Sequence, residues 1–238
     1  MDGARNRVIC VVQARMGSSR LPGKTMMKVG TKALISHVLD RLLVNFTQQD
    51  VILATTVNNK DDVLADFVKE EFPKIGCFRG DQEDVRSRFQ IIAQETNASH
   101  IIRITADDPF KDPRDIALCK QILLASNVDY CCNFFFKTIP LGMDVEGFSS
   151  LALHKAVKID DSKEAREHVT STFRNTEEFS GIYLREQRGD SSLRLTIDSR
   201  EDLEFCRDIA SLIHENIYHW QHTLEVANKV QQSTIKGL

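Results

Sequence analysis

The chain has 238 residues, with 31 Lys and Arg against 34 Asp and Glu, which gives a formal charge of −3. Hydrophobic residues make up 42% and charged residues 27%, close to the globular average, which excludes a disordered or fibrous chain. The balanced charge gives no reason to expect a nucleic-acid or membrane partner. No apolar run approaches the ~18 residues of a membrane-spanning helix, and MDGARNRVICVV lacks a signal-peptide cleavage site. We expect a soluble, cytoplasmic protein with a single domain over 1–238.

The cysteines and the C-terminal histidines are not expected to form a metal site. None of the six cysteines forms a C-x-x-C pair, and most lie in apolar runs, so buried thiols are expected rather than disulfides. Cys131 and Cys132 are adjacent and would point to opposite faces of a strand. The C-terminal histidines His214, His219 and His222 do not share one helical face, which favours a surface or interfacial role.

Short β-rich runs alternate with segments of helical period over the first 136 residues. Residues 7–13 are a continuous apolar run, as expected for a strand buried on both faces. Leu34, Val38, Leu42 and Phe46 share one helical stripe. The alternation predicts a mainly parallel sheet with helices on both faces, whose ligands bind beyond the carboxyl ends of the strands. The expected strands are 7–13, 50–56, 75–80, 100–109 (ending in a loop) and 128–136, and the expected helices are 33–46, 61–72, 84–96 and 113–126, the last opened by Pro113.

The rhythm changes after residue 134. We interpret 134–190 as an insertion or cap on the single domain. Ser199 and Asp202 form a capping-box pattern that starts a helix. The expected elements are a strand entered within 137–148, helices at 149–159 and 162–175, strand-like runs at 179–187 and 193–199, the helix that follows Ser199, and a last helix at 222–230.

The loop after the first predicted strand, QARMGSSRLPGK (13–24), combines cations, hydroxyls and glycines. Glycine lets backbone amides approach oxygen atoms, and Arg and Lys neutralise phosphate charge, so this loop is predicted to bind phosphates. A solvated basic turn is the alternative. The ending Gly-Lys-Thr suggests a Walker A loop, but five residues separate Gly17 from Gly23 where four are required. Pro22 also removes an amide from the would-be cradle.

The string VVQARMGSSRLPGK resembles the signature of the cytidylyltransferase-like nucleotidyltransferases. The nearest branch is the SpsF-like proteins of spore-coat polysaccharide biosynthesis, relatives of the CMP-sialate and CMP-KDO synthetases. The resemblance covers about 7–208. One departure is Ala106-Asp107-Asp108-Pro109, where the family has Gly-Asp-Cys-Pro or Gly-Asp-Glu-Pro, so Asp107 and Asp108 both remain candidate metal ligands. Further segments follow in the family's order: ILATTVNNKDD, FRGDQEDVRSRF, IIRITADDPFKDP, LGMDVEGF, AREHVT and LRLTIDSREDLE.

The resemblance implies a GT-A/Rossmann-like, three-layer α/β nucleotidyltransferase fold and a Mg²⁺-dependent reaction. An acceptor oxygen attacks the α-phosphorus of an NTP, usually CTP, and pyrophosphate leaves. Such a transfer needs positioning, charge neutralisation and a metal. Asp107 and Asp198 match the family's metal ligands, and Arg15, Lys24 and Asp107 are the implied catalytic residues. Turn formation by Asp107 and helix capping by Asp198 are the alternatives.

The resemblance also implies nucleoside and acceptor sites. Arg166 and His168 would suit an anionic acceptor such as a sugar acid or a phosphate, although helix-surface salt bridges are an equal alternative. For Arg79, the alternative to nucleoside binding is a role as a surface turn residue. The implied nucleotide-binding residues are Gln13, Ala14, Arg15, Gly17, Ser18, Arg20, Lys24, Thr56, Arg79, with Gly80, and Asp107. The implied acceptor residues are Asp144, Glu146, Arg166 and His168.

These observations predict a Mg²⁺-dependent cytidylyltransferase that activates a sugar or sugar acid for surface glycan synthesis. A homodimer formed through 134–190 follows from the resemblance alone. A glycosyltransferase of the GT-A type and a nucleotide-binding protein without turnover are the alternatives, and release of pyrophosphate from an NTP would distinguish all three.

Overall fold

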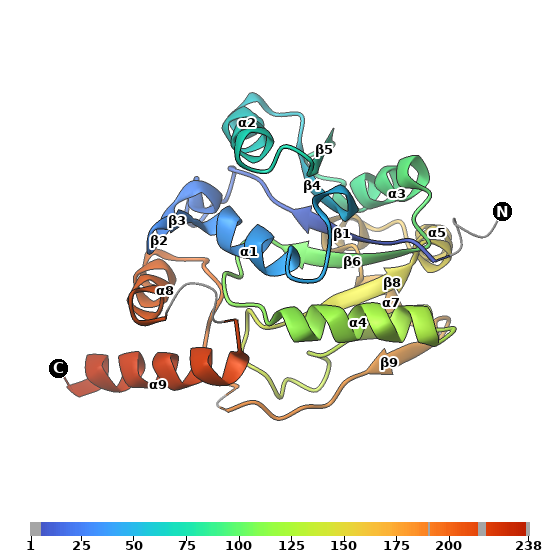
Figure 1. Cartoon of the computed structure of the whole chain (residues 1–238). Helices are drawn as coiled ribbons and strands as arrows, with labels where there is room; N and C mark the ends of the chain where they lie inside the picture. Colours follow the sequence, from blue (N-terminus) through green and yellow to red (C-terminus); the bar gives the residue numbers. More distant parts are fainter. Residues whose placement is uncertain (1–5, 190, 214–217, 237–238) are drawn as a thin grey trace.

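A seven-stranded sheet in the order β5-β4-β1-β6-β8-β7-β9 forms the centre of the computed structural model, which describes residues 6–189, 191–213 and 218–236 (Figure 1). Within these residues β8 alone runs against its neighbours, and every other pairing in the sheet is parallel. The expected mainly parallel sheet is therefore confirmed. The strands are β1 Val8–Gln13, β4 Val51–Thr56, β5 Gly76–Gly80, β6 His100–Thr105, β7 Tyr130–Cys132, β8 Glu146–Ser149 and β9 Gly181–Tyr183, and β2 Lys28–Val29 pairs with β3 Lys32–Ala33 in a separate hairpin.

Helices cover both faces of the sheet (Figure 1). Residues of α1, α2 and α4 pack on one face, and residues of α3, α5 and α7 pack on the other. Pro113 opens α4, and Ser199 and Asp202 form the expected capping box of α8. The helices are α1 Leu34–Leu42, α2 Asp62–Glu71, α3 Val85–Thr96, α4 Pro113–Ala125, α5 Ser150–Ile159, α6 Lys163–His168, α7 Ser171–Asn175, α8 Arg200–Leu212 and α9 Trp220–Lys236, with 3-10 turns η1 Lys24–Met26, η2 Gln48–Asp50 and η3 Asn59–Asp61.

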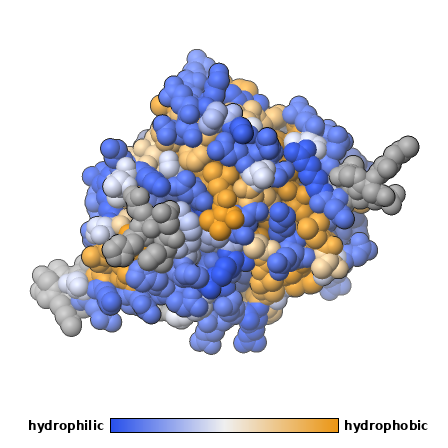
Figure 2. All heavy atoms as spheres, in the orientation of Figure 1, coloured by the Kyte–Doolittle hydropathy of each residue, from blue (hydrophilic) through white to orange (hydrophobic). Residues whose placement is uncertain are grey.

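The central strand β1 shows how the apolar runs create two cores. Side chains alternate along a strand, so Cys10 and Val12 enter the core under α1 and α4, whereas Ile9 and Val11 enter the core under α3 and α5. All four are fully buried. On the side of the molecule drawn in Figure 2, mainly hydrophilic residues surround patches of hydrophobic ones. No helix among the described residues is long and apolar enough to cross a membrane.

The segment 193–199 is not the strand that its apolar alternation predicts. Leu193, Leu195 and Ile197 are buried in a third core with α8 and α9, which explains the alternation. Among the described residues no strand of the sheet pairs with this segment, which forms one isolated parallel bridge, between Arg194 and Leu141. Leu195 N donates to Leu141 O at 2.8 Å, and Ile197 N donates to a loop carbonyl, Asp107 O, at 2.9 Å. The result is an extended segment that ends beside β6.

Two further expectations are corrected by the structure. The strand expected over 128–136 ends at Cys132, because Asn133 N and Oδ1 bond the backbone of Val145 and the chain then turns. The helix expected over 162–175 is broken at Val169, whose φ is 57°. The range 134–190 contributes β8 and β9 to the sheet. Its roles as an insertion or cap and in dimer formation stay predictions.

The cysteine expectations hold with one exception. Cys131 and Cys132 enter opposite cores, as adjacent strand residues should. All six cysteines are free, and five are buried, whereas Cys77 is exposed.

Gly142 is the position where the backbone most needs to lack a side chain. Its φ is +98°, and an added Cβ would lie 2.6 Å from the Leu195 carbonyl carbon. We expect Gly142→Ala to lower the free energy of unfolding by about 3 kcal/mol, because it combines left-handed strain with a backbone clash. Urea unfolding measures this. Gly17→Ala is the control: a Cβ there meets nothing within 4 Å, so a change within about 0.5 kcal/mol is expected. Equal stability of the two variants would contradict the argument.

Candidate active site

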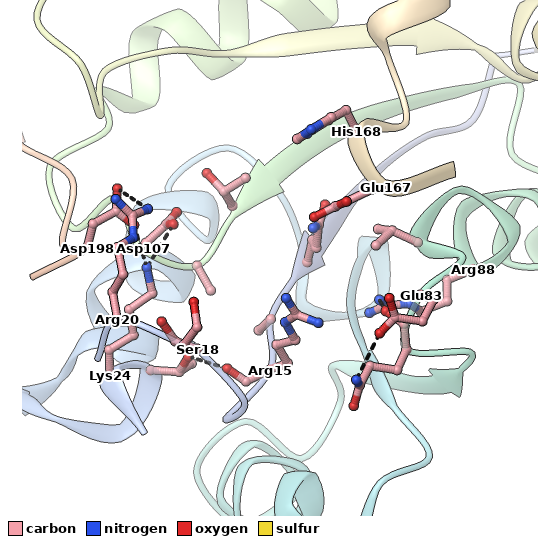
Figure 3. Close-up of a pocket in the computed structure, with 18 of the residues that line it drawn as sticks. Arg15, Ser18, Arg20, Lys24, Glu83, Arg88, Asp107, Glu167, His168 and Asp198 are labelled. Atoms are coloured by element: carbon pink, nitrogen blue, oxygen red, sulfur yellow. Dashed lines mark hydrogen bonds and ion pairs between the residues drawn. The ribbon is translucent and has the colours of Figure 1, made fainter. Parts of the chain in front are cut away.

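A cavity of about 330 Å³ opens at the carboxyl ends of β1 and β6 (Figure 3). Its walls come from the loop after β1, the start of α3, the end of β6, the end of α6 and Asp198, which lies two residues before α8. This is the edge of the sheet where ligands were expected. The lining residues are Gln13, Ala14, Arg15, Ser18, Ser19, Arg20, Lys24, Thr25, Gln82, Glu83, Val85, Arg88, Arg103, Thr105, Ala106, Asp107, Glu167, His168 and Asp198.

The loop 14–24 is closed at its base by two hydrogen bonds to its own backbone carbonyls. Gly23 N donates to Met16 O at 2.9 Å, and Thr25 Oγ1 donates to Arg15 O at 3.1 Å. Gly23 has a φ of 76°, which glycine adopts without strain. The loop leads into the short 3-10 turn η1 rather than an α-helix, which agrees with the rejection of a Walker A loop.

Asp61, at the end of η3, fixes this loop to β4. Its buried carboxylate accepts from Met16 N at 2.7 Å and from both the backbone N and the hydroxyl of Thr56. A carboxylate that accepts backbone N–H groups forms a strong, directional anchor. The sequence analysis did not single out Asp61, which lies in the ILATTVNNKDD segment.

Lys24 lies between two carboxylates from distant parts of the chain. Its Nζ is 3.1 Å from Asp107 Oδ2 and 3.0 Å from Asp198 Oδ1, and it also donates to Ile197 O at 2.6 Å. Arg20 approaches the other Asp198 oxygen at 3.1 Å. Burial alone would raise the pKa of Asp198, but Lys24, Arg20 and Arg194 together hold that pKa below its ordinary value. Two carboxylates thus converge on one positively charged atom.

Asp107 and Asp108 occupy different environments. Asp107 lines the cavity, whereas Asp108 is buried and pairs with Lys111 at 2.8 Å. Thr105 Oγ1 also donates to Asp108 Oδ2 at 2.6 Å. Burial raises the pKa of Asp108 to about 6, against the opposing effect of Lys111. The second acid is therefore turned away from the cavity and does not face solvent.

The start of α3 supplies cavity residues that the sequence analysis missed. Arg88 is fully buried, donates to Ala54 O at 3.2 Å and leaves its Nε without a partner. Burial lowers its pKa, and the nearby Arg15 lowers it further. Glu83 and Gln82 lie at the same end of the cavity. Arg88 lies one helical turn after Asp84, the residue that caps α3. This capping position was the sequence signal that could have identified Arg88 as a cavity residue.

A second cavity of about 250 Å³ adjoins the first, because Arg15 and Gln82 line both. Gly17 lies here rather than in the main cavity. Within the described residues, Arg15 forms no ion pair, so its charge is open to a ligand.

The floor of the main cavity holds a charged group in the middle of a strand. Arg103 of β6 donates to Gln13 Oε1 through Nε and Nη2, at 3.2 and 3.0 Å, and to Glu146 Oε1 at 2.5 Å. A lone Arg in the apolar run HIIRIT was the signal that could have identified it. Glu146 was predicted to bind the acceptor, but it is buried beneath Arg103.

Several other predicted site residues do not line either cavity in the described part of the chain. Thr56 is buried and donates to Asp61. Arg79 donates to Thr56 O and Asn58 O, so it stabilises the loop after β4. Arg166 is exposed and pairs with Asp161. Gly80 adjoins Arg79 at the end of β5.

Asp144, which was also expected to bind the acceptor, does not line the described cavities. It lies before β8, and its carboxylate is 3.7 Å from Lys111. His168 is the predicted acceptor residue that the structure does place in the cavity, beside Glu167 (Figure 3). His219 directly precedes α9, and His222 lies in the first turn of that helix. His214 lies outside the described residues.

The cavity therefore gathers a glycine-containing basic loop, two carboxylates around a shared cation, and residues from α3 and α6 on the opposite walls. The family model of cytidylyltransferases matches residues 9–230. The chain belongs to the cytidylyltransferase family. It is a nucleotidyltransferase, and the conserved fold of such enzymes matches the sheet described above.

Individual relatives agree with this cytidylyltransferase assignment. The chain is 32% identical over 208 residues to the spore coat polysaccharide biosynthesis protein SpsF of Bacillus subtilis, covering 84% of each chain. A cytidylyltransferase structure from Leptospira borgpetersenii has a TM-score of 0.89 and 31% identity, covering 95% of each chain. A CMP-2-keto-3-deoxy-manno-octonic acid synthetase solved with CTP has a TM-score of 0.62 at 18% identity, covering 86% of this chain and 98% of that one. The match to this synthetase shows that the two proteins share a fold.

The contrast between the two adjacent acids can be tested by stability. Asp108→Asn would leave the buried Lys111 ammonium with the backbone carbonyl of Asp144 and, as its nearest remaining carboxylate, the more distant one of Asp144, so the free energy of unfolding should fall by about 3 kcal/mol. Asp107→Asn removes a partly exposed partner of Lys24, which keeps Asp198, and should cost less than about 1 kcal/mol. Urea unfolding of both variants measures the difference. A larger loss for Asp107→Asn would show that the roles are reversed.

Proposed function

We propose that this cytidylyltransferase transfers CMP from CTP to a sugar acid and releases pyrophosphate, with Mg²⁺ as cofactor. The observation that carries the proposal is the pair of carboxylates, Asp107 and Asp198, on one cation at the mouth of a basic loop. The names of the relatives support the substrates: 3-deoxy-manno-octulosonate cytidylyltransferases match about half of this chain, and one structural neighbour holds CTP. The name of SpsF supports a role in polysaccharide biosynthesis.

The basic loop would hold the triphosphate. Arg15 is exposed in the cavity without an ion pair among the described residues, and Arg20 has an exposed side chain beside Asp198. Guanidinium groups suit phosphate oxygens because they donate two parallel hydrogen bonds. The hydroxyls of Ser18 and Ser19 line the same wall and add neutral donors. Asp61 would keep this loop in place when charge enters the cavity.

The residues present fit a magnesium ion. Asp107 and Asp198 already converge on the ammonium of Lys24, so the site is built for a positive charge. Magnesium commonly takes one or two carboxylates and completes its shell with phosphate oxygens and water, so these two are sufficient. When bound, the ion would neutralise phosphate charge and orient the triphosphate. No group of three or more His, Cys, Asp or Glu able to hold a metal is found among the described residues.

The side chains of this protein would do the remaining work by positioning. Lys24 would exchange carboxylate contacts for phosphate contacts, because its ammonium lies where both are within reach. Glu167 and His168 approach from α6, across the cavity from the basic loop, and would face the acceptor (Figure 3). An acceptor held there would have its hydroxyl presented to the α-phosphorus, which is the main catalytic requirement of phosphoryl-type transfer.

Nucleotide binding and product release test the proposal together. Thermal shift with each of the four NTPs and Mg²⁺ should show the largest stabilisation with CTP. Turnover with CTP and 3-deoxy-manno-octulosonate should release one pyrophosphate for each CMP-sugar formed. Pyrophosphate release distinguishes this enzyme from a glycosyltransferase or a non-catalytic binding protein, and stabilisation by no NTP would refute the proposal.

Lys24→Ala should weaken CTP binding about 30-fold, because it removes a charge-assisted contact worth about 2 kcal/mol. Calorimetry measures the dissociation constant. Lys28→Ala is the matched control, since Lys28 is an exposed lysine four residues further along the same segment. An unchanged affinity in Lys24→Ala, or the same loss in both variants, would remove Lys24 from the site.

Asp198→Asn should reduce both turnover and Mn²⁺ binding in the presence of CTP, by about 100-fold or more in turnover. Mn²⁺ electron paramagnetic resonance measures the bound ion directly. Asp208→Asn, an exposed acid on α8, should change neither property. Normal Mn²⁺ binding in Asp198→Asn would exclude Asp198 as a ligand.

A further inference from the structure

Arg103 belongs to a cluster of unequal charge around the buried Glu146, in which the side chains of Arg103 and Arg174 are 15% and 26% exposed. Glu146 is its direct cross-strand partner in the register of β6 and β8. The same carboxylate accepts from Arg174 of α7 at 3.2 Å, and also from Tyr130 Oη at 2.6 Å and Thr170 Oγ1 at 3.1 Å. Two guanidiniums therefore share one carboxylate, and the cluster carries an excess positive charge. Buried charge of this kind is costly unless something neutralises it.

Among the described charged members of the cluster, Arg103 is the one that brings the excess charge to the cavity. Arg103 lines the cavity and Arg174 does not, although both contact Glu146. A guanidinium has five N–H groups, and three of those of Arg103 are engaged by Gln13 and Glu146. The remaining ones are available to a ligand. Gln13 and Glu146 hold the planar group at both edges, so its orientation is fixed in advance.

The position of Arg103 separates it from the phosphate-binding loop. It pairs with Val11 in the register of β1 and β6, two residues before Gln13 and Thr105 at the strand ends, so it belongs to the floor of the cavity. The nearby Asp144 is also within the electrostatic reach of Arg103, but its carboxylate faces Lys111. The same wall continues through Thr170, which is bonded to Glu146, to His168 at the cavity.

We propose that Arg103 is the specificity-determining residue that receives the anionic group of the acceptor, and that Gln13 and Glu146 are its positioning residues. The inference rests on the proposed function, because it assigns the acceptor end of that same site. A planar carboxylate matches the two-pronged geometry of a guanidinium and would cancel the excess charge of the cluster. Neutral sugars would leave that charge unpaired and would be rejected.

The test compares an acid with its uncharged form. Calorimetry measures the binding of 3-deoxy-manno-octulosonate and of its methyl ester in the presence of a CTP analogue. The analogue has a methylene bridge between the α- and β-phosphorus, so its CMP group cannot be transferred. The native enzyme should prefer the acid by roughly 10- to 100-fold, the range of one charge-assisted contact. Arg103→Gln should lose that preference and bind the acid correspondingly more weakly.

Arg174→Gln is the matched control. It removes the excess charge of the cluster and a contact with Glu146, but no donor at the cavity. Because Arg103 and its N–H donors stay in place, this variant should lose less of the preference for the acid than Arg103→Gln does. Thermal unfolding of both variants verifies the fold. Equal losses in the two variants, equal native affinity for acid and ester, or no binding of the acid would each overturn the proposal.

Affinity for the CTP analogue separates this proposal from the proposed function. Arg103→Gln should bind the analogue within about threefold of native, because the phosphate loop is unchanged. A matching loss of nucleotide affinity would assign Arg103 to the nucleotide and overturn the proposal. Failure of the native enzyme to bind the analogue would instead refute the proposed function.

Discussion

The arrangement of the site depends on one ammonium group shared by two carboxylates. Lys24 joins the loop after β1 to Asp107, at the end of β6, and to Asp198, just before α8. Without a cation the two carboxylates would repel each other, so Lys24 holds together three segments that are far apart in the sequence. The same contact prepares the site for a ligand, because a group that already tolerates a cation between two acids needs little rearrangement to accept another.

The parallel pairing of β1 with β6 decides which side chains form the cavity floor. Val11 and Gln13 lie on the α3 side of the sheet, and the register places Arg103 and Thr105 beside them on that same side. The apolar positions of these strands fill the core, and the polar positions at their ends are left for the cavity. Asp198 reaches the same edge by a different route, since its segment is held by loop carbonyls rather than by a strand.

The acids and bases of this region fall into two groups. Some are neutralised by partners within the protein, and others keep charge or donors that a ligand could meet. Asp108 and Lys111 neutralise each other inside the protein, and Asp61 is fully used by backbone and hydroxyl donors. Arg15 and Arg103 differ from these, because each leaves donors or charge uncompensated and lines the cavity. The distinction follows from burial, since an uncompensated charge is tolerated only where solvent or a ligand can reach it.

The sequence by itself determined the sheet, the order of its first strands and helices, and the basic loop, because these depend on local periodicity, on turn residues and on strand ends. It also placed Asp107 at the ligand-binding edge by the rule for parallel sheets, whereas Asp198 reaches that edge from a segment that is not one of the strands of the sheet. Only the tertiary structure decided which neighbouring polar residues face the cavity. Asp107 and Asp108 are adjacent, and Glu146 and Arg103 are distant, yet their roles follow from cross-strand register and from buried partners such as Lys111. The prediction of a strand over 193–199 was wrong for a related reason. The apolar alternation of this run results from burial in a third core. A strand also needs a neighbouring strand for its backbone hydrogen bonds, and local alternation does not show whether a distant part of the chain provides one.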